Sequence, residues 1–415
     1  MVAQKLTDVD EKYLTGSQAA EFLGVKAATL YAYASRGLIE SVPSDNARER
    51  CYRLTELIKL RQSSRGFKNA KDTEAAVWTG PVIKSAITEI RNEGHRYRGE
   101  SVVDLALADR PFEQVAELLW GNEQTPTASW KKIKPLAIPK QVKMLASSDA
   151  DYLDLLKLLL VSEEMVDPVP RKLAAADIFD IARSLIVTMS ITPGLARRRD
   201  KYIADSPFPI AQTLLFALSG NKSRDRARVV NRALVLCADH ELNASALAAR
   251  VAASCDATLY SCLLSALGTF SGTLHGSASR RAEDIIHGSL KFKTTVAWMK
   301  DYLRQFEEIP GFGTELYSQG DPRAKVLIDT AVQIGGKNKH LQRLLEIVEC
   351  VREQMGLEPN LDVGLAAISY ALLLPPGSGS TIFAISRTSG WIAHAIEQRM
   401  YGGVIRPRAR YIGKM

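Results

Sequence analysis

The sequence predicts an almost entirely helical protein. From Ala76 onward, apolar residues recur at three- and four-residue spacing, which is the pattern of one buried helix face. The clearest examples are VVDLALADRPFEQVAELLW, DYLDLLKLLLVSEEMV, AADIFDIARSLIVTMS and IAQTLLFALSG. The breaks between such segments fall at proline or glycine, and few stretches alternate with period two over five or more residues. This pattern is typical of an all-α domain.

The totals fit a globular protein of several domains. With 415 residues and a mass of 45.6 kDa, the chain is long enough for two or three domains and a large core. It has no run of about 18 uncharged apolar residues, so we expect no membrane span. The first residues, MVAQKLTDVDEKYL, are too polar for a secretory signal.

Cysteine content and charge indicate compartment and partners. The five cysteines form an odd set without metal spacing, which predicts no metal site and a reducing cytoplasm. The net charge of +8 suits an anionic partner such as nucleic acid or a phosphorylated cofactor, and it is equally compatible with an ordinary basic surface.

The N-terminal part has the pattern of a small helical unit. We expect Ser17 to cap a first helix that ends at Leu23, and a second helix over 27–35 that stops near Gly37. A basic, turn-rich segment around 44–52 follows, and then a third helix to Leu60. Residues 61–75 lack apolar periodicity and are predicted to be a linker.

Residues 1–60 resemble the winged helix-turn-helix domain of MerR-type regulators. The resemblance implies that the second helix enters the major groove of DNA, with a short wing beside it. Candidate groove contacts are Lys26, Thr29, Tyr31 and Tyr33, and candidate phosphate contacts are Arg36, Arg48, Arg50 and Arg53. The alternative is a packing or dimer-contact module. Because only one copy is present, operator recognition would require a dimer.

Two of the six histidines flank the stretch from Ala238 to Ser279. We expect one long buried helix with His240 at one end and His275 at the other, so that both imidazoles point into one cleft. Asn243 and Ser245 can cap its start, and Gly276 permits close approach of a ligand to the backbone. The alternative is a core helix with two satisfied histidines.

Several collinear motifs accompany these histidines. They are DHELNAS at 239–245, LHGSA at 274–278, YRG at 97–99, GFG at 311–313, DPRA at 321–324, PNLD at 359–362, FAISRTSGWIAHAIEQ at 383–398 and RPR at 406–408. In order and spacing they resemble the citrate synthase family, which includes 2-methylcitrate synthases, over about 76–415. The resemblance implies a large domain at 76–276 and 374–415, a small domain at 277–373 and a homodimer. It also implies an acyl-CoA substrate and no metal or tightly bound cofactor.

The resemblance assigns roles to individual residues. Asp362 would be the base that deprotonates the acyl-CoA, and burial between Leu361 and Val363 could raise its basicity. His275 would donate to the thioester oxygen, and His240 would bind a carboxylate of oxaloacetate. Further cations would clamp carboxylates or meet the phosphates of coenzyme A. The carboxylate clamps are Arg323, Arg387 and Arg406, and the phosphate candidates are Arg280 and Arg281.

Each of these roles has a plainer alternative. Asp362 has the sequence position of a helix N-cap. Arg387 lies in an apolar stretch and could be neutralised by an internal salt bridge instead of a substrate. Arg280 and Arg281 could lie on a solvated face.

One position departs from the family pattern. Thr314 follows Gly-Phe-Gly where the family carries a histidine that polarises the ketone of oxaloacetate, and Glu315 adds a negative charge next to it. A threonine hydroxyl can donate one hydrogen bond but cannot become a cation. By analogy with the loss of one oxyanion donor, this could slow the reaction by about 10²- to 10³-fold.

Three functions are compatible with these observations. The first is a synthase that joins acetyl-CoA or propionyl-CoA to oxaloacetate or a related 2-oxo acid. The second is an enzyme that performs part of this chemistry, such as thioester hydrolysis or the retro-aldol direction. The third is a DNA-binding regulator whose weakened synthase domain senses an acyl-CoA or a carboxylate.

Overall fold

A computed structural model describes most of the chain. The described residues are 13–23, 25–35, 37–43, 50–53, 56–57, 60, 83–122, 127–166, 178–199, 209–306, 308–314, 316–317, 319–409, 411 and 413. Arg36, Arg48, Glu315 and the predicted linker at 61–75 therefore lie outside the described residues. Spatial clustering divides the chain into two compact units, Met1–Val82 with Cys350–Leu357 and Ile83–Glu349 with Glu358–Met415.

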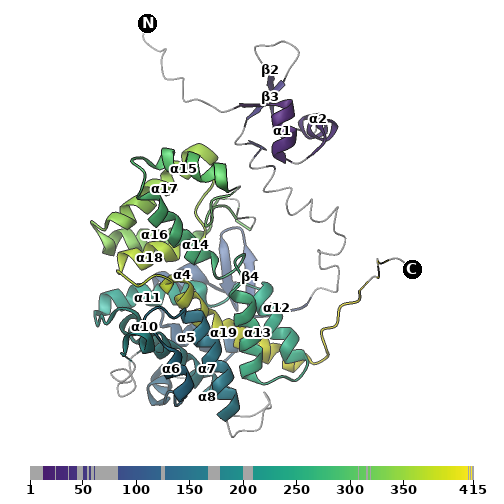
Figure 1. The fold of residues 1–415 in the computed structure, drawn as a ribbon. Helices are drawn as coiled ribbons and strands as arrows, with labels where there is room; N and C mark the ends of the chain where they lie inside the picture. The colour runs from purple at the N-terminus through teal and green to yellow at the C-terminus, as the bar shows by residue number, and fades with distance from the viewer. Residues whose placement is uncertain are drawn as a thin grey trace. The chain divides into compact units, whose positions relative to one another are not determined.

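The N-terminal unit combines two helices with a small antiparallel sheet (Figure 1). Its elements are β1 (Tyr13–Thr15), α1 (Gly16–Leu23), α2 (Ala27–Ser35), β2 (Ser41–Pro43) and β3 (Arg50–Arg53). Strand β3 pairs with both β1 and β2. The predicted cap of α1 is wrong, because Ser17 lies inside the helix. Thr15 occupies the cap and exchanges hydrogen bonds with Gln18, as in a capping box.

From residue 83 onward the structure is mostly helical, as predicted. The α-helices are α4 (Val102–Leu107), α5 (Phe112–Trp120), α6 (Lys140–Leu145), α7 (Tyr152–Val166), α8 (Ile178–Ile191), α10 (Ile210–Ser219), α11 (Arg224–Cys237), α12 (Ala244–Ser254), α13 (Leu259–Phe270), α14 (Ala278–Ser289), α15 (Thr295–Gln305), α16 (Pro322–Gly335), α17 (Lys339–Met355), α18 (Leu361–Ala371) and α19 (Ser378–Tyr401). Two 3₁₀ helices are η1 (Thr127–Lys132) and η2 (Thr192–Arg197).

A second three-stranded sheet modifies the expectation of a purely helical body. Strands β4 (Thr88–Arg91), β5 (Gly94–Tyr97) and β6 (Glu100–Ser101) pair antiparallel in the order β4-β5-β6. These strands have four, four and two residues, which is too short to show a period-two pattern in the sequence.

Helix α19 is the central helix of this body. Nearly all of its residues are buried, as expected for a helix that is packed on every side. It begins after Gly377, whose φ is +81°, and its first backbone amides donate to the carboxylate of Glu283 on α14. Residues Ser378 to Ser380 form the first turn of α19.

The prediction of one long helix between His240 and His275 is wrong. The chain forms two helices, α12 and α13, joined by a turn in which Asp256 has a φ of +63°. Asn243 caps α12 as predicted, and Thr258 caps α13. A single straight helix would hold the two histidines roughly 50 Å apart. The turn instead reverses the direction of the chain, so that both histidines lie at the same end of the helix pair.

One helical stretch has the length and hydropathy of a membrane span. Among the described residues this stretch is Ile178–Arg197, formed by α8 and η2. Of its most apolar window, 72% is buried inside the protein, which is the behaviour of a core helix.

Candidate active site

His275 is held in a buried polar contact at the end of α13. Its Nε2 lies 2.8 Å from Ser245 Oγ, and Trp391 Nε1 donates to the same oxygen at 3.0 Å. Burial, and then the charge of Arg387, lower the pKa of His275 to about 4. The imidazole is therefore neutral at pH 7 and can act as a neutral donor.

Gly276 serves packing at the protein core. A Cβ placed on it would lie 2.1 Å from the ring of Phe270. The space that was predicted to admit a ligand is therefore filled by Phe270, whose ring centroid lies 5.2 Å from that of His275. This aromatic contact helps to hold His275 in position.

His240 lies between α11 and α12 and contacts a second loop of the protein. Its Nε2 is 2.9 Å from the hydroxyl of Tyr317. Burial, followed by the charge of Arg323, holds the pKa of His240 well below its usual value. His275 also contributes to this shift, so the two histidines of the predicted site share one electrostatic environment.

Arg323 and Arg387 are both buried but have different partners. Arg323, at the start of α16, makes two hydrogen bonds to the carboxylate of Asp321, from Nε at 2.9 Å and from Nη2 at 2.7 Å. Arg387 on α19 donates from Nε to the carbonyl oxygen of Cys237 at 2.7 Å and lies over the ring of Phe383. In the described part of the chain no carboxylate forms an ion pair with Arg387, so the salt-bridge alternative does not hold there. Burial lowers the pKa of Arg387.

Asp362 is the second residue of α18, and its side chain does not cap the helix. Asn360 is the cap, because its side chain accepts from the backbone amide of Asp362 at 3.0 Å. The N-cap alternative for Asp362 is therefore wrong. Ser279 Oγ donates to the Asp362 carboxylate. Burial nevertheless raises the pKa of Asp362 to about 6, against the opposing effects of Ser279 and Arg323.

The loop that carries Thr314 lies against the start of α18. Asn360 N donates to the carbonyl oxygen of Gly311 at 2.9 Å, and a Cβ on Gly311 would lie 2.6 Å from Val363 Cγ2. Thr314 is half-buried, and its Oγ1 accepts from Leu316 N at 3.2 Å. One lone pair of this hydroxyl is thus used within the loop, and no described residue accepts its proton.

The three other predicted cations have different surroundings. Arg280 forms an ion pair with Asp151 at 2.6 Å on the surface. This agrees in part with the alternative that Arg280 lies on a solvated face. Arg281 is half-buried, and its charge lowers the pKa of Asp362, which places it near the carboxylate. Arg406 is exposed in the extended C-terminal segment that follows α19 (Figure 1).

Sequence reasoning missed a third histidine in this environment. His95 on β5 is 2% exposed, and its ring centroid lies 5.1 Å from that of His240. Burial, then Arg323 and Arg387, hold the pKa of His95 well below its usual value. The only available signal was its position two residues before the Tyr97-Arg98-Gly99 motif.

A buried network fixes the backbone beside His240. Thr88 Oγ1 donates to Asp239 Oδ2 at 2.6 Å, and His394 Nε2 faces Asp239 Oδ1 at 3.3 Å. Arg250 Nε donates to His394 Nδ1 at 3.0 Å, so in the neutral imidazole Nδ1 is the acceptor and Nε2 carries the proton. Gly390 is required for this packing, because a Cβ there would lie 2.3 Å from Asp239 Oδ1.

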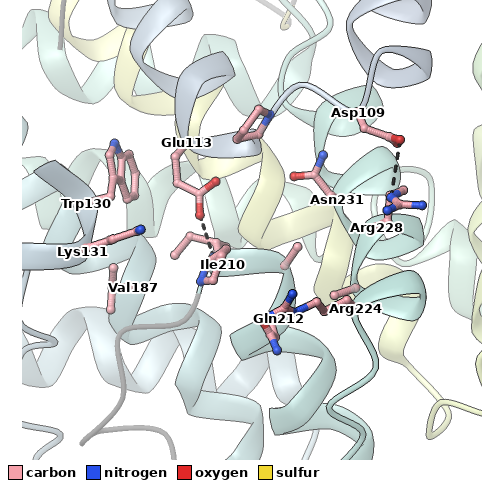
Figure 2. A pocket seen from close by; sticks show the side chains of 14 residues that line it. Asp109, Glu113, Trp130, Lys131, Val187, Ile210, Gln212, Arg224, Arg228 and Asn231 are labelled. Atoms are coloured by element: carbon pink, nitrogen blue, oxygen red, sulfur yellow. Dashed lines mark hydrogen bonds and ion pairs between the residues drawn. The ribbon is translucent and has the colours of Figure 1, made fainter. Parts of the chain in front are cut away.

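A cavity of about 520 Å³ lies elsewhere in the same unit (Figure 2). Its carboxylates already have partners, since Glu113 accepts from Ile210 N at 2.7 Å and Asp109 lies 3.6 Å from Arg228. None of the residues that line it belongs to the histidine and arginine cluster. The polar lining residues are Asp109, Glu113, Trp130, Lys131, Gln212, Arg224, Arg228 and Asn231.

Comparisons with known proteins identify the family. The model of the family described as citrate synthase, C-terminal domain, matches residues 76–408. A citrate synthase of Haloferax volcanii is 33% identical over 347 residues, which cover 77% of this chain and 89% of the relative. Citrate synthase 2 of Bacillus subtilis is 29% identical over 352 residues, covering 79% and 93%. The 2-methylcitrate synthase 1 of Corynebacterium glutamicum is 29% identical over 342 residues, covering 76% and 88%.

A solved structure shares the fold. It is the ternary complex of a Thermoplasma acidophilum citrate synthase with carboxymethyl coenzyme A and oxaloacetate. It matches with a TM-score of 0.72 and 24% identity over 85% of this chain and 96% of that chain. The extent of the family match and the Haloferax relative together settle the question that the motifs raised: the chain belongs to the citrate synthase family.

Proposed function

We propose that this protein condenses an acyl-CoA, such as acetyl-CoA or propionyl-CoA, with oxaloacetate or a related 2-oxo diacid. The observation that carries the proposal is the convergence of Asp362, His275, His240 and two buried arginines in one electrostatic environment. Relatives named as citrate synthases and 2-methylcitrate synthases support it. This chemistry needs an acid of raised basicity, neutral imidazoles and an arginine that is free to bind a carboxylate, and Arg387 has no ion pair among the described residues.

In the first step, Asp362 removes a proton from the carbon next to the thioester. The electrons of the broken C–H bond move toward the thioester oxygen, where a hydrogen-bond donor must stabilise the developing charge. A pKa of about 6 leaves Asp362 mostly ionised at pH 7 and makes it a stronger base than an exposed aspartate.

His275 is proposed to be the donor at the thioester oxygen. Ser245 Oγ accepts from Trp391, and its single proton can be donated to Asn243 Oδ1 or to His275 Nε2, both at 2.8 Å. When Ser245 donates to Nε2, the proton of the neutral imidazole is on Nδ1. This tautomer is the one that can donate to the thioester oxygen.

In the second step, the enol or enolate carbon attacks the ketone carbon of the oxo acid, and the ketone oxygen takes up the electrons. His240, Arg323 and Arg387 would hold the carboxylates of this substrate. Water then hydrolyses the thioester and releases coenzyme A. Arg280 and Arg281 would bind the phosphates of coenzyme A. Thr314 stands in place of the family histidine, and loss of that donor without a replacement would lower turnover by about 10²- to 10³-fold.

Arg406 is proposed to complete the carboxylate clamp in a homodimer. The residue is exposed on an extended segment, so this clamp requires either movement of the segment or a second copy of the chain. Exposed Met400 and Tyr401 at the end of α19 are apolar surface that a second copy could cover. Light scattering should give a dimer mass, and a monomer would contradict this assignment.

Release of free coenzyme A tests the proposed reaction. Purified protein is incubated with acetyl-CoA or propionyl-CoA, with and without oxaloacetate, and free thiol is measured. We expect release that depends on oxaloacetate and is lost in Asp362→Asn. Release without oxaloacetate would identify the protein as a hydrolase, and no release at high protein concentration would remove the enzymatic proposal.

A second candidate function is DNA binding by the N-terminal unit. It is supported by two short helices next to an antiparallel strand pair, with Lys26 and Tyr31 exposed on the helical part and Arg50 exposed on β3. Thr29 on α2 is half-buried. A gel shift on the upstream DNA of the gene should weaken steeply with salt if these cations meet phosphates. No shift, or one that is insensitive to salt, would contradict this function.

A further inference from the structure

His95 is placed among the proposed substrate-binding groups, yet it has no part in the steps described above. It lies on β5 opposite Ile90 of β4. Its ring makes edge contacts with Tyr97 at 5.2 Å and with His240 at 5.1 Å between centroids. Because Arg323 and Arg387 both act on the pKa of His95 and of His240, the two imidazoles lie in the field of the same two cations.

The Nδ1 atom of His95 is buried and lacks a partner. Within the described residues no group forms a hydrogen bond with it, although the side chain is almost fully enclosed. Buried polar atoms are nearly always paired, and leaving one unpaired costs about 1–3 kcal/mol. A histidine with a purely structural role in the core would be expected to satisfy both nitrogens. The unpaired atom therefore points to a ligand.

The contacts of Tyr97 determine which nitrogen of His95 can donate. Tyr97 Oη accepts from Asp239 N at 3.0 Å. Its own proton has three possible acceptors, namely Val235 O at 3.1 Å, Asp239 O at 3.2 Å and His95 Nε2 at 3.3 Å. When Tyr97 donates to Nε2, the neutral imidazole carries its proton on Nδ1. A bound anion with an oxygen near Nδ1 would favour this arrangement.

We propose that His95 binds the 2-oxo diacid through Nδ1–H and donates to its ketone oxygen. It would thereby supply from β5 the hydrogen bond that the Thr314 position no longer supplies as an imidazole. This inference rests on the proposed function and names a further residue of the same site. The geometric basis is the ring contact with His240 and the buried Nδ1 that has no partner among the described residues.

Two substitutions separate the two nitrogens of His95. In His95→Asn the amide occupies the position of Nδ1, whereas in His95→Gln it approaches the position of Nε2. We expect His95→Gln to lower kcat/KM for oxaloacetate by about 10²-fold and to leave the KM for the acyl-CoA unchanged, while His95→Asn retains most of the activity. A structural role through Tyr97 would give the reverse order. His340→Gln, at a half-buried histidine on α17, is the control.

Binding is measured independently of turnover, with oxaloacetate labelled with ¹³C at the ketone. Its infrared carbonyl band should shift to lower frequency on the wild-type protein and less on His95→Gln. Adding Thr314→His to His95→Gln should restore both the shift and the rate. Equal shifts and equal kcat/KM in wild type and His95→Gln would overturn the inference.

The same measurements distinguish failure of the inference from failure of the proposed function. If the wild type releases no coenzyme A but shifts the carbonyl band in a His95-dependent manner, the condensation is wrong and the role of His95 in binding stands. If the wild type releases coenzyme A and His95→Gln is unaffected, only the inference is wrong. If the wild type neither binds nor turns over oxaloacetate, both are wrong.

Discussion

Replacement of Asp362 by Asn should abolish the proposed reaction and stabilise the protein. The carboxylate is desolvated at the start of α18, and its pKa is raised from 3.8 to about 6. A rise of this size corresponds to a cost of about 3 kcal/mol for keeping the ionised form in the folded state at neutral pH. Asn is uncharged and can still accept the hydrogen bond from Ser279, so the variant avoids this cost.

The size of the effect depends on pH. Below about pH 4 the carboxyl is protonated in both the folded and unfolded states, so wild type and variant should be equally stable. Between about pH 4 and pH 6 the unfolded state ionises first, which progressively destabilises the wild type. Above about pH 6 the difference should be constant at about 3 kcal/mol, or roughly 3–4 °C in Tm.

Thermal unfolding monitored by circular dichroism from pH 4 to pH 8 provides the test. Asp284→Asn, at an exposed carboxylate on α14, is the matched control and should show no such pH dependence. Equal Tm values for wild type and Asp362→Asn at pH 8 would show that the carboxylate is not desolvated. A lower Tm for the variant would show that the favourable contacts of the ionised form outweigh its desolvation, and either result refutes the reasoning.

Three further predictions follow from the same geometry. The profile of kcat/KM against pH should fall on the acid side with an apparent pKa near 6, because Asp362 must be ionised; a limb near pH 4 would contradict this. Ser245→Ala should lower kcat about tenfold without loss of fold, because His275 loses the hydrogen bond that selects its tautomer; an unchanged kcat would exclude that role. Gly390→Ala should lower the free energy of unfolding in urea by about 1–3 kcal/mol, because its Cβ would overlap Asp239; a neutral result would contradict the close approach.

The helical class could be predicted because long apolar periods are visible in the sequence. The turn between α12 and α13 could not, because it contains neither glycine nor proline, and Asp256 adopts its left-handed conformation in an Ala- and Ser-rich run. The cap of α18 was also ambiguous. Asn360 and Asp362 are both good N-cap residues, and only the structure shows that Asn360 caps and leaves the Asp362 carboxylate available.

The position of His95 depends on contacts that no local pattern encodes. Tyr97, its neighbour on β5, bonds to Val235 and Asp239, which lie far away in the sequence. The motif residues His240, His275, Arg323 and Asp362 were available as candidates because each stands in a recognisable short segment.

The charge of Arg387 has a consequence for handling the protein. Among the described residues this buried guanidinium forms no ion pair, and the charge of Arg323 acts on it, so we expect the free site to attract small anions. Any small dianion that fills it binds only the native chain, so it shifts the unfolding equilibrium by mass action, by about 2.7 kcal/mol at a concentration 100 times its Kd. If the protein has the proposed function, its melting temperature should therefore depend on the buffer anion, and citrate or malate buffers should stabilise the occupied site.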